Sequence, residues 1–172
     1  MNPVELDQFL EMVLRLAMAT ILGGIVGIDR FLHHKPAGVR VLSLVSMGAA
    51  AISMVSVTAV TAAGKLPSDG VLRTIQGVLS GIGFLGAGVI MRTTGKDKVH
   101  GITTAATIFV VAILGMVCGL GQWQLSICTF IFCCLILVVG KRIESHLQRI
   151  ALRNKQDGSS TASVDDSDES SI

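Results

Sequence analysis

Charged residues at the ends of long apolar segments are the residues of this chain that could do chemistry. Asp29, Arg30, Arg40, Arg73 and Arg92 each border or enter an apolar run. A charge at membrane depth is costly and tends to face the bundle interior or a water-filled pocket, where it can hold an ion or a partner group. We therefore treat these five residues as a candidate functional polar cluster, in which Asp29 is expected to pair with Arg40 or Arg92.

A plainer interpretation of the same residues stays open. Long arginine side chains can extend to the lipid headgroups and merely set topology. A cation site is the sharper hypothesis, but hard cations need several oxygen ligands. The apolar part of the chain offers Asp29 and little other carboxylate, so any metal ligands are unknown.

Other chemistry has little support in the sequence. The histidines stand in no triad-like pattern with a serine or cysteine. The Gly-x-x-x-x-Gly-Lys-Ser/Thr phosphate loop is missing from the sequence. The four cysteines, Cys118, Cys128, Cys133 and Cys134, match no zinc spacing and are interpreted as small apolar residues. We predict no enzymatic activity, no cofactor and no nucleic-acid partner.

The composition that must position the polar residues is that of a membrane protein. Of 172 residues, 51% are hydrophobic and only 15% are charged, against about 25% charged in soluble domains. Long apolar runs without alternation predict helices, because a helix satisfies its own backbone in lipid. We predict an all-α membrane protein with a bundle of five transmembrane helices, at about 8–28, 41–63, 72–91, 101–119 and 122–140.

Charge distribution predicts the orientation of these spans. Eleven Lys and Arg residues fall on one side of the five spans and three on the other. The positive-inside rule places the N-terminus outside and the C-terminus in the cytoplasm. Within the first span, Glu11 and Arg15 are four residues apart, so they can pair on one helical face.

Glycine is unusually frequent in the first and third spans. Small residues in spanning helices let a second backbone come close, so these glycines predict tight helix packing. An alternative stays open for the third span, where glycines can mark a broken helix whose exposed carbonyls line a transport site. The residues concerned are Gly23, Gly27, Gly77, Gly81, Gly83, Gly86 and Gly88.

The end of the chain differs in composition from the spans. We predict a transmembrane domain over 1–140, a short basic amphipathic helix over 141–156 and a disordered, acidic, Ser-rich tail over 157–172. The basic helix can lie on an anionic lipid surface. It can equally be a solvated extension of the fifth span.

Several blocks of this sequence together resemble the MgtC/SapB family of bacterial inner-membrane proteins. The order and spacing of the blocks match from about Leu16 to Gly121. The Gly81–Arg92 block followed by Gly101–Thr107 is the most specific part. The full set is Val26-Gly27-Ile28-Asp29-Arg30, Ala37-Gly38-Val39-Arg40, Ser80-Gly81-Ile82-Gly83-Phe84-Leu85-Gly86-Ala87-Gly88-Val89-Ile90, Gly101-Ile102-Thr103-Thr104-Ala105-Ala106-Thr107 and Gly119-Leu120-Gly121.

This resemblance implies a five-helix domain in the bacterial cytoplasmic membrane, associated with magnesium limitation and virulence. Some members of the family act by binding other membrane proteins, including the proton-translocating ATP synthase. The matched functional positions are the acid–arginine pair Asp29–Arg30, Arg40 and Arg73. The chain departs from the family pattern at Asp29, where Glu is usual, and it does not show the soluble C-terminal domain that many relatives carry.

The function that we expect from the sequence is interaction with partner membrane proteins, in the setting of magnesium homeostasis and stress adaptation. The partners implied are the lipid bilayer and either another membrane protein or a second copy of this chain. The alternative is a small Mg²⁺ transporter or channel subunit, with a pathway along Asp29 and the third span.

Overall fold

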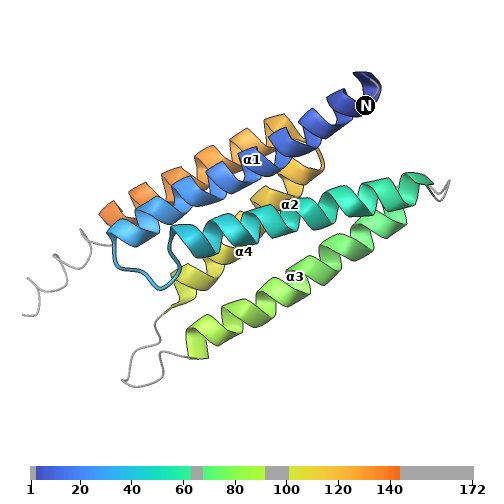
Figure 1. Ribbon diagram of the computed structural model, residues 1–172. Helices are drawn as coiled ribbons and strands as arrows, with labels where there is room; N and C mark the ends of the chain where they lie inside the picture. The colour runs from blue at the N-terminus through green and yellow to red at the C-terminus, as the bar shows by residue number, and fades with distance from the viewer. Residues whose placement is uncertain (1–2, 63–67, 92–100, 144–172) are drawn as a thin grey trace, which may run out of the picture. The chain divides into compact units, whose positions relative to one another are not determined.

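The computed structural model describes residues 3–62, 68–91 and 101–143, and all regular structure in them is helical. Five of the helices are long and apolar enough to cross a membrane, which confirms the predicted all-α class. Four carry labels in Figure 1, and the fifth follows α4 as Trp123–Ile143. The labelled helices are α1 (Pro3–Leu32), α2 (Val39–Ala62), α3 (Ser68–Met91) and α4 (Ile102–Gly119).

Helix α1 is longer than predicted, and helix α3 is continuous. Helix α1 has 30 residues and therefore a length of about 45 Å, which exceeds the roughly 30 Å hydrocarbon thickness of a bilayer. Its first turns, with Glu5 and Glu11, are exposed. Helix α3 continues through all of its glycines without a break. The alternative of a broken third span with exposed carbonyls is therefore wrong.

Helices α1, α2 and α4 pack through small residues. A Cβ atom at Gly23 would lie 2.7 Å from the Ser46 Cβ, and one at Gly27 would lie 2.5 Å from the Val39 Cα. On α4, a Cβ at Gly115 or Gly119 would overlap the backbone of α2 at Ser46 and Ala50. Glycine is thus required where α2 meets α1 and α4.

The interior of these three helices combines small apolar residues with hydroxyl groups. Ala19, Leu22, Ala50, Leu114 and Cys118 form one buried cluster. Three hydroxyls of α2 bond back to carbonyls of their own helix, as expected for serine and threonine in spans. The pairs are Ser53 to the Ala49 carbonyl at 2.8 Å, Ser56 to the Ser53 carbonyl at 2.7 Å and Thr58 to the Met54 carbonyl at 3.0 Å.

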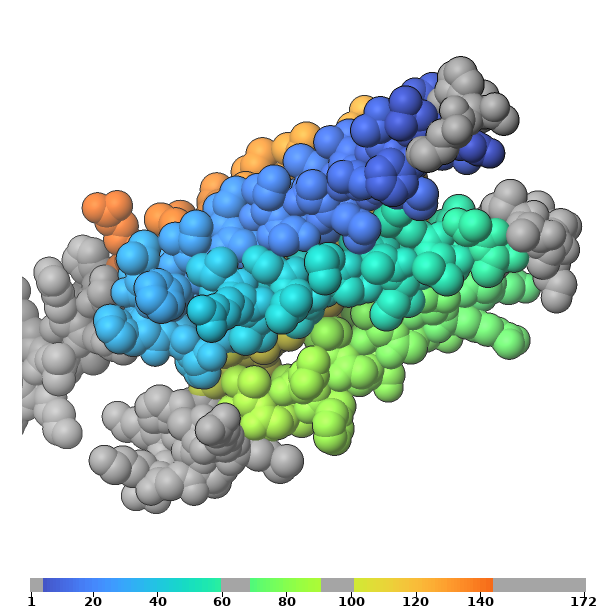
Figure 2. Space-filling model, viewed as in Figure 1, coloured from blue at the N-terminus to red at the C-terminus, as the bar shows by residue number. Residues whose placement is uncertain are grey.

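Helix α3 lies at the edge of the labelled group. It runs alongside α2 and α4, and its other side is left uncovered in the space-filling view (Figure 2). The side that packs inward carries Ile82, which is buried, and Gly86, whose Cβ would lie an ordinary 3.4 Å from the Ala105 Cβ. The outward side includes Phe84, which is 81% exposed.

The chain divides into two compact units, residues 1–131 and 132–172. The first contains α1 to α4 and the beginning of the fifth helix. Leu120, Gly121 and Gln122 connect α4 to that helix, and Gly121 has a φ of +75°, which favours glycine. The Ser126 hydroxyl lies 3.0 Å from the Cys118 sulfur. In the second unit the described residues are Phe132–Ile143, the continuation of the fifth helix.

Candidate functional site

The end of α1 buries a charged residue in the helix bundle. Arg30 lies in the last turn of α1 and is 1% exposed. One terminal guanidinium nitrogen donates a hydrogen bond to the Thr104 hydroxyl of α4. The Nε atom is buried and has no hydrogen-bond partner among the described residues. Arg30 therefore does not extend to the headgroups, and the topology-only interpretation is wrong for this residue.

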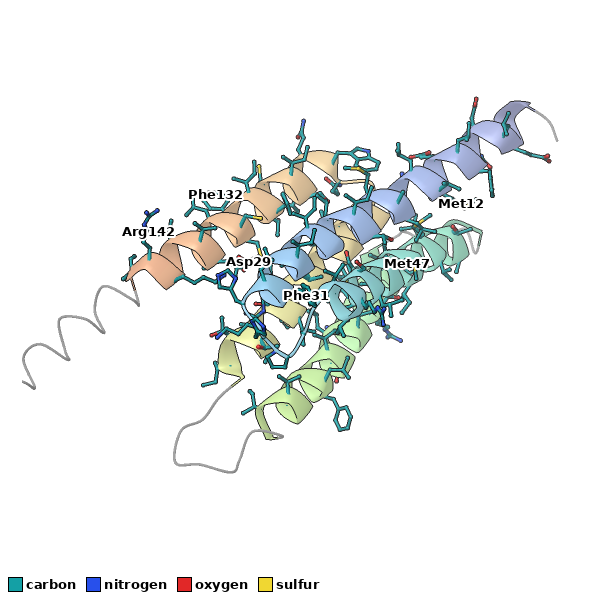
Figure 3. All side chains as sticks on the ribbon, turned by 60° about the vertical axis from the view of Figure 1, so that its left-hand side comes forward. Met12, Asp29, Phe31, Met47, Phe132 and Arg142 are labelled. Atoms are coloured by element: carbon teal, nitrogen blue, oxygen red, sulfur yellow. The ribbon has the colours of Figure 1, made fainter. Side chains whose placement is uncertain are left out.

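Asp29 precedes Arg30 and turns toward the loop that follows α1. Figure 3 places Asp29 near the end of α1, close to Phe31. Its side chain is 29% exposed, and its Oδ1 lies 3.6 Å from Nδ1 of His33. The same His33 nitrogen is 2.7 Å from the Asp29 carbonyl oxygen. One neighbour of Asp29 is thus a histidine one helical turn away, and the alternative pairing with Arg92 lies outside the described residues.

Two of the other arginines, Arg40 and Arg73, are exposed, unlike the buried Arg30. Arg40 is exposed in the first turn of α2. Arg73 is exposed near the start of α3, at the end of the bundle where α1 begins (Figure 1). Because consecutive helices run in opposite directions, Arg73 is one helix length away from Arg30. The prediction of a single cluster is therefore wrong for Arg73, and Arg92 lies outside the described residues.

The N-terminal half of α1 holds a second arginine, Arg15, that we expected only to pair locally. Arg15 forms the predicted ion pair with Glu11. It also donates from Nη1 to the carbonyl oxygen of Gly119 at 2.9 Å. Gly119 is the last residue of α4, so Arg15 satisfies a terminal carbonyl and places a positive charge at the negative end of that helix dipole. Spacing within α1 could not have shown this contact.

The space beside Arg15 is a pocket of about 640 Å³ between α1 and α2. Glu11, Arg15 and Thr58 give it a polar part, and Met12, Met54 and Val57 give it an apolar part. Met12, which Figure 3 labels, lies well toward the beginning of α1. The pocket therefore lies along the N-terminal half of α1, whereas Arg30 lies in the last turn of the same helix.

The glycines predicted to pack fall into two sets. Gly23 and Gly27 lie against α2 at distances that exclude a Cβ, and Gly86 faces Ala105. Gly77, Gly81, Gly83 and Gly88 would carry a Cβ with no described atom within 4 Å. The expected contacts of these four with other helices of the chain are therefore not found in the described ranges. Ile82 and Gly86 are buried on the inward side of α3, whereas Gly77, Gly81, Gly83 and Gly88 are exposed.

A family model described as the MgtC family matches residues 16–146 of the chain. This range covers more than half of the sequence. The chain belongs to the MgtC family. The resemblance drawn from the sequence blocks is thereby confirmed, and together with the five apolar helices it makes this protein a multi-pass bacterial membrane protein.

Relatives from several bacteria support this membership. Protein SrpB of Synechococcus elongatus is 40% identical over 159 residues, which cover 88% of this chain and 85% of SrpB. Protein MgtC of Salmonella typhimurium is 40% identical over 128 residues, 73% of this chain and 52% of MgtC. The Escherichia coli protein named putative magnesium transporter YhiD is 36% identical over 135 residues, 75% of this chain and 60% of YhiD.

The chain therefore spans nearly the full length of one relative and only a little over half of the other two. No solved structure matches it.

Within this MgtC family chain, three contacts in the structure were not predicted from the sequence: the packing of two α4 glycines and the long-range partners of two arginines. Gly115 and Gly119 form a Gly-x-x-x-Gly pair that lies outside the glycines predicted to pack. The partners of Arg15 and Arg30, Gly119 and Thr104, lie 104 and 74 residues away along the chain, and no local pattern gives such pairings.

Proposed function

We propose that this MgtC family protein acts in magnesium homeostasis by binding a helix of a partner membrane protein through the outer face of α3. We define the outer face as Gly77, Ser80, Gly81, Phe84 and Gly88, all of which are exposed. These residues recur at helical spacing and include Gly77-x-x-x-Gly81, the pattern that brings spanning helices close together. The occupant that fits is a second spanning helix with small residues at its contact.

The observation that carries the proposal is the open surroundings of the α3 glycines. Glycine costs about 1 kcal/mol relative to alanine in a helix interior. At Gly115 and Gly119 close contact with α2 offsets this cost. Gly77, Gly81 and Gly88 have no such contact among the described residues. A second helix against the outer face would give the α3 glycines the close contact that α2 gives the glycines of α4, and this contact would offset their cost.

The magnesium setting rests on the family. The name of the Escherichia coli relative refers to magnesium transport, and the sequence blocks resemble a family associated with magnesium limitation. Localisation in the cytoplasmic membrane, which the family resemblance implies, belongs to this proposal, as does the orientation with the basic loops inside, which the positive-inside rule predicts.

Cation transport is the second candidate, because of the name of that Escherichia coli relative. In this candidate Asp29 is the expected carboxylate of the pathway. Helix α3 would not contribute carbonyl ligands along its length, because a continuous helix uses those carbonyls for its own hydrogen bonds. The two candidates differ in whether the purified protein alone moves an ion.

Reconstituted liposomes containing a magnesium indicator separate the two candidates. The proposal predicts no Mg²⁺ flux above that of empty liposomes, for the natural sequence and for Asp29→Asn alike. Saturable flux that Asp29→Asn abolishes would overturn the proposal in favour of transport.

A growth assay tests the outer face itself. In a host that lacks its own copy, the natural sequence is expected to restore growth under magnesium limitation, and Gly81→Leu is expected to fail. The matched control is Gly83→Leu, because Gly83 lies about 200° around the helix from Gly81 and outside the outer face. Equal growth of the two variants, at equal protein levels, would count against the outer face.

A further inference from the structure

The buried charge of Arg30 is poorly compensated by its direct contacts. A buried cation normally needs an ion pair and a full set of hydrogen bonds. Arg30 has no carboxylate within ion-pair distance among the described residues, and its contact there is the Thr104 hydroxyl. The adjacent Asp29 attracts it through space, but that carboxylate is partly exposed and lies beside His33. Within the described ranges, the buried Nε–H has no acceptor.

Arg30 reaches a helix end that is itself positive. Thr104 is the third residue of α4, and the first hydrogen bond within α4 runs from the Ala105 N–H to the Gly101 carbonyl. The N–H groups of the first turn therefore have no acceptor within the helix, and they form the positive end of its dipole. Gly101 at the N-cap provides no side-chain cap. An acidic or hydroxyl residue is the usual solution at such an end.

We propose that the first turn of α4 and Arg30 together bind a phosphate-type oxyanion. The first-turn N–H groups would donate to it, as helix N-termini do to anions in general. Arg30 Nε would supply a charge-assisted donor. The Thr104 oxygen accepts from Arg30, so its hydroxyl keeps a proton to donate to the anion. This proposal does not depend on the outer face of α3.

An anion can approach the backbone of the first turn of α4 from one side, whereas the Arg30 and Thr104 side chains are buried and would shift to meet it. Ile102 is 59% exposed and Thr103 is exposed, so the first turn of α4 is open on one side. Arg30 lies in the last turn of α1, just before the loop that contains His34 and Lys35, both exposed. Basic residues near a site raise the local concentration of anions. The phosphate could be a free ion or the headgroup of an anionic lipid, since both present the same oxygens.

Thermal unfolding of the full chain in dodecyl maltoside, a detergent without phosphate, tests the site. One arm adds sodium phosphate against sodium chloride at equal ionic strength. The other arm adds short-chain phosphatidylglycerol against diacylglycerol of the same chain length. We expect a saturable rise of the unfolding midpoint in one arm, which identifies the source of the phosphate, and none with chloride or diacylglycerol.

Variants assign the effect to the proposed residues. Arg30→Met is expected to abolish the saturable rise, and Thr104→Val to weaken apparent affinity at least about tenfold, as for loss of a hydrogen bond to a charged group. Without anion, Arg30→Met should unfold at the same temperature or higher, because it removes a buried charge. Lys35→Gln is the control for general attraction and should change affinity less than about threefold.

Three results would overturn the proposal. The first is the lack of a saturable rise in both arms for the natural sequence. The second is an equal rise in Arg30→Met and the natural sequence. The third is an unchanged affinity in Thr104→Val, together with loss of folding in Arg30→Met, which would make Arg30 a structural residue of the bundle.

Discussion

In the core of α1, α2 and α4, glycines are contacted by a neighbouring backbone, whereas along the outer face of α3 they have open space before them. A Cβ at Gly115 would overlap the Ser46 backbone, and one at Gly81 would meet no described atom. The two sets look alike in sequence, since both contain Gly-x-x-x-Gly. The difference teaches that the motif marks a surface suited to close approach, and that only the structure reveals whether the same chain supplies the second helix.

The largest expected loss of stability comes from adding a methyl group to a glycine that packs against the backbone of another helix. Gly115→Ala places a methyl group where the Ser46 carbonyl lies, so α2 and α4 must separate. We expect a loss of at least about 3 kcal/mol in the free energy of unfolding. Unfolding in mixed detergent micelles, followed by circular dichroism, measures it.

The matched control is Gly81→Ala on the outer face of α3. This change meets open space and improves helix propensity, so stability should stay within about 1 kcal/mol of the natural protein. Equal losses in the two variants would show that the two glycine sets do not differ, and the comparison would fail.

An intermediate effect is expected from Arg15, which joins α1 to the end of α4 in the contacted region. Arg15→Met removes the hydrogen bond to the Gly119 carbonyl and the pair with Glu11. Loss of a bond to a charged group predicts about 1–3 kcal/mol lower stability. The same unfolding assay applies, and Arg73→Met, at an exposed arginine near the same end, should change stability by less than about 0.5 kcal/mol. Equal changes in stability for Arg15→Met and Arg73→Met would show that the hydrogen bond from Arg15 to the Gly119 carbonyl does not stabilise the fold.

The five spans could be predicted because each is encoded locally, by a long apolar run between polar connectors. The Glu11–Arg15 pair could be predicted for the same reason, since it depends only on helical spacing. The surroundings of Arg30 could not. Its hydroxyl partner Thr104 is 74 residues away, and burial of the guanidinium depends on how α1 and α4 pack. Snorkelling and burial are equally compatible with an arginine at the end of an apolar run.

Which side of α3 packs against the other helices also could not be predicted, for a physical reason. The small residues of the family-like block suggested the contact side, because small residues permit close approach. In the folded chain the contact side is set by Ile82 and Gly86. Periodicity shows that a helix has two sides, but in an apolar helix both sides are acceptable to lipid, so hydropathy does not say which one faces the bundle.

The most direct test of the central claim is photocrosslinking in living membranes, with benzoylphenylalanine at Phe84. Phe84 is 81% exposed on the outer face of α3, and Leu44 of α2, at 63%, is the matched exposed control. We predict a discrete protein adduct from Phe84, absent from Leu44 and lost when Gly81→Leu is added, with an adduct mass that differs from that of a second copy of this chain. Lipid adducts alone at Phe84, as at Leu44, would contradict the account.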